Sequence, residues 1–215
     1  YLFSLKQSAQ QVEGLEDRVG QLSKIVAEAI ISDEFDEILI IGHSTGTQTA
    51  VSILDKALAT APRSADRRAQ LSFLTLGGSI PMLSWQPDAG WFRAELQRVA
   101  QTQGLDWLDF TAAQDGACFA LHDPVASSGL AHPEGREPKP KLLSIKLFDL
   151  FSAARFKEIH HNWGRVHFQY LRAGEQQAEY DFFAITAGAK TLAARYAHRP
   201  SAAGFDRFRI KWLGN

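Results

Sequence analysis

Residues 38–46 read ILIIGHSTG and join an apolar run to a serine flanked by glycines. The run 38–41 has no polar alternation, which is typical of a strand buried on both faces. Over residues 47–60 the apolar residues recur at helical spacing, so a helix is expected to follow at once. The sequence therefore places Ser44 on a sharp turn between a buried strand and a helix.

The same patterns continue on both sides of this turn. Helices and short apolar strands alternate along the first half of the chain, which is typical of an α/β fold with a mostly parallel sheet and flanking helices. We interpret residues 1–215 as a single domain of this class. Helices are expected over 5–32, 47–60 and 91–103, and strands over 38–41, 71–76 and 107–110.

The second half of the chain is less regular. Residues 111–141 are rich in Asp, His, Gly and Pro and are predicted to form a long loop region. A long ordered loop after a parallel strand is more often functional than accidental. Beyond it we expect helices over 142–160 and 180–196, with an extended or turn-like segment at 166–171.

Composition and charge exclude several classes of protein. The chain has 23 Lys and Arg against 24 Asp and Glu, which leaves no basic excess for binding nucleic acid. Its single cysteine, Cys118, excludes an internal disulfide and a cysteine-built zinc site. No apolar run approaches the roughly 18 residues that cross a bilayer. No His-x-x-x-His or His-Glu-x-x-His pair is present, so neither a metal nor another cofactor is expected.

The segment Gly42-His43-Ser44-Thr45-Gly46 has the pattern G-x-S-x-G between a strand and a helix. A strained backbone is expected to hold the Ser44 hydroxyl clear of the sheet, with the glycines letting strand and helix approach closely. The helix N-terminus favours negative charge, and the Thr45 N–H is placed to donate to an oxyanion. An ordinary glycine-rich turn with an N-cap serine is the simpler alternative. The lysine and the glycine spacing of phosphate-binding loops are missing.

At these residues the sequence resembles the α/β-hydrolase family of serine esterases and lipases, whose nucleophile turn often reads G-H-S-x-G. The resemblance is specific over residues 38–58 and continues in the order of the elements. It implies a catalytic triad, with an acid after the second strand beyond the turn and a histidine later in the chain.

The resemblance implies an acid just after Phe110. Asp115 is the candidate, and Asp123 is the alternative. Asp109 lies inside the strand, where its side chain is expected to point into the packing. A loop aspartate also serves as a turn former or a helix cap, which is the simpler interpretation of either loop residue.

His167 is the implied histidine, because it lies short of the final predicted helix. In the simpler interpretation, its ring fills an aromatic cluster with Phe168 and Tyr170. Two of the other candidates, His160 and His161, end a charged predicted helix, where cationic side chains are favourable at the C-terminus. The histidines that remain as alternatives are His122, His132, His160, His161 and His198.

These residues predict a serine hydrolase that cleaves a small-molecule or lipid ester. In this scheme His167 removes the Ser44 proton, Asp115 fixes the tautomer of the ring, and water later releases the acyl group. An acyltransferase or a thioesterase would use the same triad. The substrate wall is expected to include Trp85, Phe119 and Trp163.

The chain departs from the family pattern before Ser44. Only 43 residues precede the serine, whereas the family has several strands there and draws its second oxyanion donor from one of their loops. The strand 38–41 would then form an exposed apolar edge. We therefore expect an N-terminally truncated, C-terminal portion of a longer hydrolase. A partner chain that completes the sheet and a reduced fold are the alternatives.

The missing strands also support a second function, that of a non-catalytic protein on the hydrolase fold that serves in binding or assembly. The compartment stays open from the sequence. The cytoplasm is favoured because no secretory signal is visible, and an upstream targeting segment would lie outside the sequence.

Overall fold

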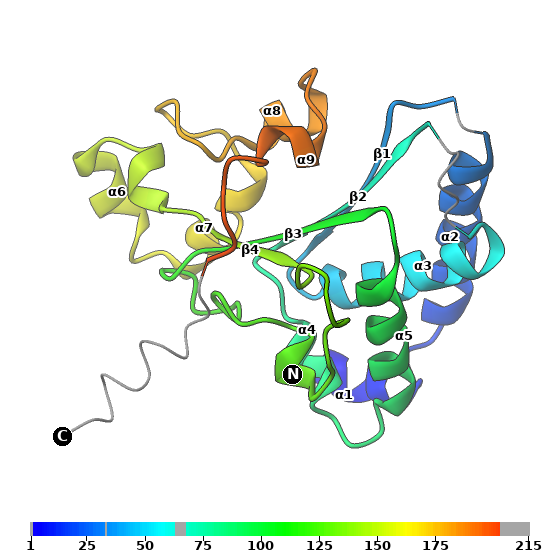
Figure 1. The fold of residues 1–215 in the computed structure, drawn as a ribbon. Coiled ribbons are helices and arrows are strands. Elements are labelled where there is room, and N and C mark those ends of the chain that lie inside the picture. Colours follow the sequence, from blue (N-terminus) through cyan, green and yellow to red (C-terminus); the bar gives the residue numbers. More distant parts are fainter. Residues whose placement is uncertain (1, 33, 63–67, 203–215) are drawn as a thin grey trace.

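The computed structural model of the chain describes residues 2–32, 34–62 and 68–202 (Figure 1). Within these residues the centre of the fold is a parallel sheet of four strands in the order β1-β2-β3-β4. The all-parallel sheet with helices beside it confirms the predicted α/β class. The strands are β1 (Glu37–His43), β2 (Gln70–Leu76), β3 (Leu105–Thr111) and β4 (Lys141–Ser144).

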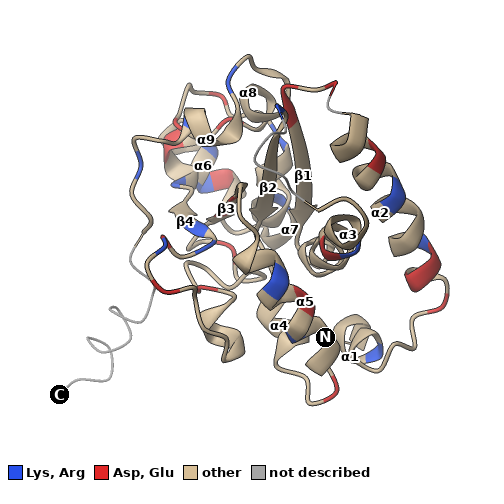
Figure 2. Cartoon of the chain, turned by 45° about the vertical axis from the view of Figure 1, so that its right-hand side comes forward, with Lys and Arg blue, Asp and Glu red and all other residues tan. Residues whose placement is uncertain are grey.

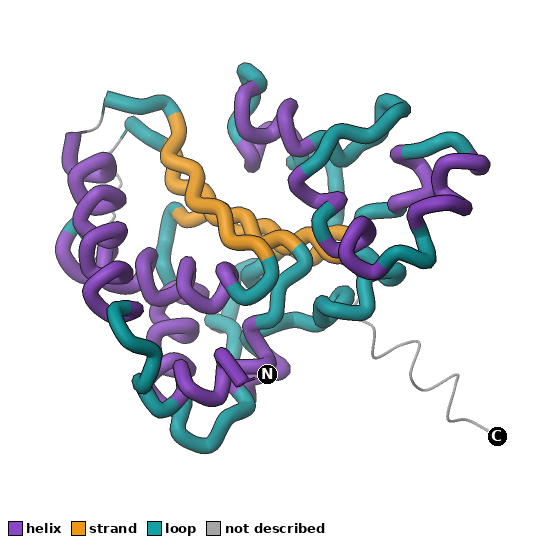
Figure 3. Tube along the Cα trace, turned by 180° about the vertical axis from the view of Figure 1, so that it is seen from behind, coloured by secondary structure: helices purple, strands orange, loops and turns teal. Residues whose placement is uncertain are grey.

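Helices cover both faces of the sheet, as Figures 1 and 3 show from opposite sides. One face is covered by α2 (Leu15–Ser32), α3 (Gly46–Thr60) and α5 (Gly90–Gln101). The other is covered by short helices from the second half of the chain: α6 (Ala153–Ile159), α7 (Trp163–His167), α8 (Phe182–Ala187) and α9 (Leu192–Arg195). The remaining elements are α1 (Leu2–Ser8), which contacts α4 (Ile80–Ser84), and the 3-10 turns η1 (Ala126–Ser128), η2 (Leu147–Leu150) and η3 (Gln169–Leu171).

Burial of the sheet on both faces explains the uninterrupted apolar runs of its strands. Successive strand residues point to opposite faces. Ile40, Phe73 and Trp107 pack toward α2, α3 and α5, whereas Leu74 and Phe110 pack toward the short helices. Each strand therefore needs apolar residues at consecutive positions, as the sequence pattern at 38–41 and 71–76 predicted.

The predicted helix over 5–32 is wrong over its first part, because the chain forms two helices there. Between α1 and α2, Gln10 has φ +56° and Gly14 has φ +69°, both in the left-handed region. A right-handed helix cannot continue through such residues. The sequence also failed to indicate α4, a single short turn that starts beside Pro81.

The predicted helix over 142–160 is wrong as well. Residues Lys141–Ser144 form β4, which pairs with β3, and α6 begins only at Ala153. A short buried strand and a buried helix give the same apolar run, so periodicity did not separate them. The segment 166–171, expected to be extended or turn-like, is not extended: it holds the end of α7 and the 3-10 turn η3. The predicted helix over 180–196 is divided into α8 and α9.

In the described part of the chain, β1 lies at the edge of the sheet, with β2 as its strand partner. Its apolar residues are partly exposed, as expected of an edge strand. Whether an upstream segment or a partner chain pairs with this edge stays a prediction.

The outer surface carries charges of both signs, as α2 illustrates in Figure 2 with its acidic and basic residues. Among the helices described, none is long and apolar enough to cross a membrane.

The two glycines of the turn differ in their surroundings. A Cβ at Gly42 would lie 2.8 Å from the Thr47 Cα and 3.0 Å from the Gly46 carbonyl oxygen. A Cβ at Gly46 would meet nothing within 4 Å. Close approach of β1 and α3 therefore requires glycine at position 42, and the prediction that both glycines serve this approach is wrong for position 46.

Gly42→Ala is expected to lower the free energy of unfolding by about 1–3 kcal/mol, because its Cβ meets backbone atoms. Gly46→Ala is the matched control and is expected to be neutral or to stabilise by up to about 1 kcal/mol, since alanine favours a helix. Urea unfolding followed by circular dichroism measures both effects. Equal effects of the two variants would contradict this explanation.

Candidate active site

Ser44 occupies a strained turn between β1 and α3. Its φ is +56°, a left-handed conformation that costs a non-glycine residue about 1–3 kcal/mol. The turn is held by hydrogen bonds on both sides: the Ser44 N–H donates to the Leu76 carbonyl oxygen at 3.0 Å, and the Thr47 hydroxyl donates to the Ser44 carbonyl oxygen at 2.7 Å. The predicted strained conformation is therefore present.

Thr45, the predicted oxyanion donor, is the N-cap residue of α3 and is exposed. Its φ of -63° is already helical, so its N–H points along the start of the helix. The first N–H groups of a helix have no acceptor within the helix and carry its positive dipole end. The position suits an oxyanion, although the role itself stays a prediction.

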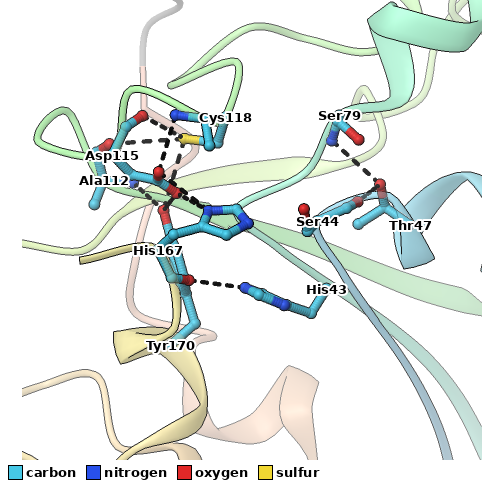
Figure 4. Close-up of polar contacts among 10 residues, drawn as sticks. His43, Ser44, Thr47, Ser79, Ala112, Asp115, Cys118, His167 and Tyr170 are labelled. Carbon is cyan, nitrogen blue, oxygen red and sulfur yellow. Dashed lines mark hydrogen bonds and ion pairs between the residues drawn. The ribbon is translucent and has the colours of Figure 1, made fainter. Parts of the chain in front are cut away.

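Asp115 and His167 are brought together in the folded chain. His167 Nδ1 lies 2.9 Å from Asp115 Oδ2 and 3.1 Å from Oδ1. Both side chains are almost completely buried, at 5% exposed for His167 and 0% for Asp115. Figure 4 shows the other ring nitrogen of His167 on the side of Ser44.

Ser44 and the His167 ring are neighbours in this view, but the described residues include no hydrogen bond from the Ser44 hydroxyl to the ring. Such contacts are often long in enzymes without substrate and tighten in the reacting complex. The serine, the histidine and the carboxylate thus lie in the order that proton transfer requires.

Hydrogen bonds within the loop after β3 hold Asp115 in place. The Asp115 N–H donates to the Ala112 carbonyl oxygen at 3.0 Å, and the Ala117 N–H donates to Asp115 Oδ1 at 3.0 Å. On its other oxygen, Asp115 accepts a hydrogen bond from the Tyr170 hydroxyl at 3.0 Å. Sequence reasoning assigned Tyr170 only to an aromatic cluster.

The His167 ring packs against other rings. The Trp163 ring stacks on it at 5.6 Å between centroids with an interplanar angle of 12°, and the His43 ring lies at 4.8 Å between centroids. The His43 Nε2–H donates to the His167 carbonyl oxygen at 2.9 Å. Burial lowers the pKa of His43, which favours the neutral ring at this place.

His43 therefore ties the residue before the nucleophile to the backbone of the candidate base. Sequence reasoning gave it no role. Its place inside G-H-S-x-G was the signal that a polar side chain stands beside Ser44, but the contact joins residues 124 positions apart and no local pattern reveals it.

Asp123, the alternative acid, pairs with a different histidine. Its Oδ2 lies 2.6 Å from His132 Nε2, and its Oδ1 accepts from the backbone N–H groups of Val125 at 2.9 Å and Ala126 at 3.1 Å. These contacts make Asp123 a turn former that also anchors His132. Neither residue contributes to the pair formed by Asp115 and His167.

The other histidines lie apart from Asp115 in the structure. His160 is the C-cap residue of α6, and His161 beside it is exposed, as their position at a helix end predicted. His198 is exposed and lies 3.3 Å from Glu179. A ring nitrogen of His122 lies 3.1 Å from the Ala120 carbonyl oxygen of its own loop.

Cys118 is adjacent to the site but is not equipped as a nucleophile. Its thiol donates to the Asp115 carbonyl oxygen at 3.4 Å, and burial raises its pKa to about 12. A nucleophilic cysteine needs a lowered pKa, so this thiol serves packing.

Two of the three predicted wall residues contact each other, and the third contacts the site. The rings of Trp85 and Phe119 meet edge to face at 5.2 Å, and the Phe119 N–H donates to the Gly78 carbonyl oxygen at 3.2 Å. Trp163 is 62% exposed while it stacks on His167, so its ring is open to solvent beside the histidine.

Within the described residues, no group of three or more His, Cys, Asp or Glu is placed to hold a metal ion. No family model matches this chain, and comparisons with the curated proteins and with the solved structures give no significant match.

Asp109 lies buried inside β3, as the sequence indicated. The Thr75 hydroxyl donates to its Oδ1 at 2.5 Å, and the Trp107 indole N–H in turn donates to the Thr75 hydroxyl at 3.1 Å. Burial raises the pKa of Asp109 from 3.8 to about 7. Its carboxyl group is therefore largely protonated in the folded chain below neutral pH.

The raised pKa makes the stability of the fold depend on pH. Between pH 3.8 and about 7 the folded chain holds a proton on Asp109 that the unfolded chain has lost, so stability falls as pH rises through this window. In Asp109→Asn the stability is expected to fall less as the pH rises. In Asp88→Asn, a change at an exposed aspartate, the stability is expected to fall as it does in the unchanged chain. Urea unfolding at pH 5 and pH 8 measures the difference, and an unchanged pH dependence in Asp109→Asn would contradict the assignment.

Proposed function

We propose that this chain is a serine hydrolase that cleaves a carboxylic ester through an acyl-enzyme on Ser44. The observation that carries the proposal is the buried pair of Asp115 and His167, 2.9 Å apart, with the free side of the ring toward the serine. A nucleophile, a base and a group that orients the base are the three parts of this type of catalysis.

Each residue has a definite task in the proposed reaction. His167 Nε2 takes the proton as the Ser44 oxygen attacks the carbonyl carbon, and Asp115 stabilises the resulting imidazolium. The Thr45 N–H donates to the oxyanion that forms. The imidazolium then gives its proton to the leaving alcohol, and water attacks the acyl group by the same route in reverse.

The resemblance to α/β hydrolases supports the same reading. Ser44, Asp115 and His167 follow one another along the chain in the family order, on a turn after β1, a loop after β3 and the C-terminal end of α7. In the family, strands before the nucleophile strand supply the second oxyanion donor. An upstream segment or a partner chain at the edge of β1 is the proposed source here.

The substrate we propose is a small-molecule or lipid ester. The exposed face of Trp163 beside His167 offers an apolar surface for its acyl or alcohol part.

A non-catalytic binding or assembly protein on the same scaffold is the second candidate function. The observation in its favour is the edge position of β1, which leaves one side of the strand without a strand partner in the described part of the chain. An exposed edge is a template for pairing with another strand.

Labelling with a fluorophosphonate separates the two functions. The folded chain is expected to react at Ser44, and Ser44→Ala is expected to lose the label, because only an activated serine attacks phosphorus at a useful rate. The matched control is Ser32→Ala, an exposed serine of α2, which should label as the unchanged chain does. Mass spectrometry of the labelled peptide gives the site. Absence of label from the unchanged chain would favour the binding protein.

The acid assignment predicts a difference between two loop aspartates. Asp115→Asn is expected to lower the labelling rate by about 10³- to 10⁴-fold, because the amide favours the wrong tautomer of His167. Asp123→Asn, the matched control, is expected to change the rate little, since its partner is His132. A larger loss in Asp123→Asn would refute the assignment of Asp115.

A further inference from the structure

Asp115 presents an electrostatic problem, since its carboxylate is buried with no Lys or Arg in ion-pair contact within the described residues. The ion-pair partner that it does have is His167, whose ring carries a charge only when it is protonated. A buried carboxylate is costly unless hydrogen-bond donors compensate its charge. The donors around Asp115 therefore decide where its oxygens lie.

Tyr170 donates to Asp115 from outside the loop after β3. Its hydroxyl donates to Asp115 Oδ2 at 3.0 Å and accepts from the Ala112 N–H at 3.0 Å. Ala112 is the first residue after β3, so the phenol joins the end of the sheet to the acid. The tyrosine ring is 0% exposed, and burial raises the pKa of its hydroxyl, which keeps the phenol neutral and able to donate.

The surrounding residues fix the phenol in this place. The Tyr180 hydroxyl donates to the Tyr170 carbonyl oxygen at 2.6 Å. Gly77, at the end of β2, has φ +53°, and a Cβ there would lie 2.7 Å from Tyr170 Cε2 and 3.2 Å from Asp115 Oδ2. The backbone at position 77 therefore packs directly against both partners of the hydrogen bond.

We propose that Tyr170 is a positioning residue for the hydrolase, which acts through Asp115 rather than on the substrate. Its hydroxyl holds the carboxylate so that both oxygens reach His167 Nδ1–H. The ring is then kept in the tautomer that leaves Nε2 free toward Ser44. The inference rests on the proposed function and adds a fourth residue to the site.

Removal of the hydroxyl takes one contact from each group around it. In Tyr170→Phe the ring still fills its place, but Asp115 Oδ2 loses a donor and keeps only His167, the Ala112 N–H loses its acceptor, and Cys118 Sγ loses a contact at 3.6 Å. The carboxylate is then free to turn away from His167. A hydrogen bond to a charged group corresponds to about a 10- to 100-fold change in rate.

Fluorophosphonate labelling of the full chain tests this inference. Tyr170→Phe is expected to lower the maximal rate of labelling by about 10- to 100-fold while the concentration for half-maximal rate changes little, because binding of the probe does not involve the phenol. The matched control is Tyr196→Phe, whose hydroxyl donates to the Glu179 carbonyl oxygen in the same core and should leave labelling unchanged. Circular dichroism verifies that both variants are folded.

A double-variant cycle tests whether Tyr170 acts through Asp115. In an Asp115→Asn background the further change Tyr170→Phe is expected to cost less than twofold, because the group it positions is already impaired. The same 10- to 100-fold loss in both backgrounds would overturn the inference, as would full activity of Tyr170→Phe.

Proton NMR of the His167 Nδ1–H gives a readout independent of activity. Its low-field resonance is expected to shift or broaden in Tyr170→Phe and to persist in Tyr196→Phe. If the resonance is the same in Tyr170→Phe as in the chain without substitutions, the inference is overturned, whether or not that chain reacts with the probe. Absence of labelling in the unchanged chain, with a resonance that responds to Tyr170→Phe, would count against the proposed hydrolase alone.

Discussion

Parallel pairing of β1, β2 and β3 is the constraint on which the rest of the site depends. At the end of each strand a backbone hydrogen bond passes to the next: from the Ser44 N–H to Leu76, and from the Gly77 N–H to Phe110. Parallel strands end at the same edge of a sheet, so the serine turn, the glycine beside the acid and the loop of Asp115 all begin there. The candidate site lies at this edge because the pairing of the strands fixes where the serine turn, Gly77 and the loop of Asp115 begin.

The sheet alone does not orient the side chains of the candidate site. Hydrogen bonds from the second half of the chain also orient them. His167, at the end of α7, and Tyr170, in η3, both contact Asp115 Oδ2. His43 reaches from β1 to the backbone of His167. Among the described residues, the donors to Asp115 are the Ala117 N–H, Tyr170 and His167, and no Lys or Arg is in ion-pair contact with it.

The part of this arrangement that was predictable from sequence is the local part. The strand, the turn and the helix around Ser44 lie within about twenty residues, and their apolar pattern and glycines determine them. Asp115 and His167 were identified by the order of elements in a resembling family. The contacts of Tyr170 with Asp115, 55 residues away, have no local signature. β4 was missed because a run of four residues fits a strand and a helix equally well.

The strain at Ser44 bears on the choice between a catalyst and a binding protein. A turn that only joins β1 to α3 would place glycine at position 44 and avoid a cost of about 1–3 kcal/mol. A serine that only packs or caps would need neither a buried carboxylate nor a histidine beside it. A buried carboxylate needs hydrogen-bond donors, and those of Asp115 come from its own loop, from Tyr170 and from His167. The strained serine and the buried acid meet at one edge of the sheet, which is the juxtaposition that the proposed nucleophilic catalysis requires.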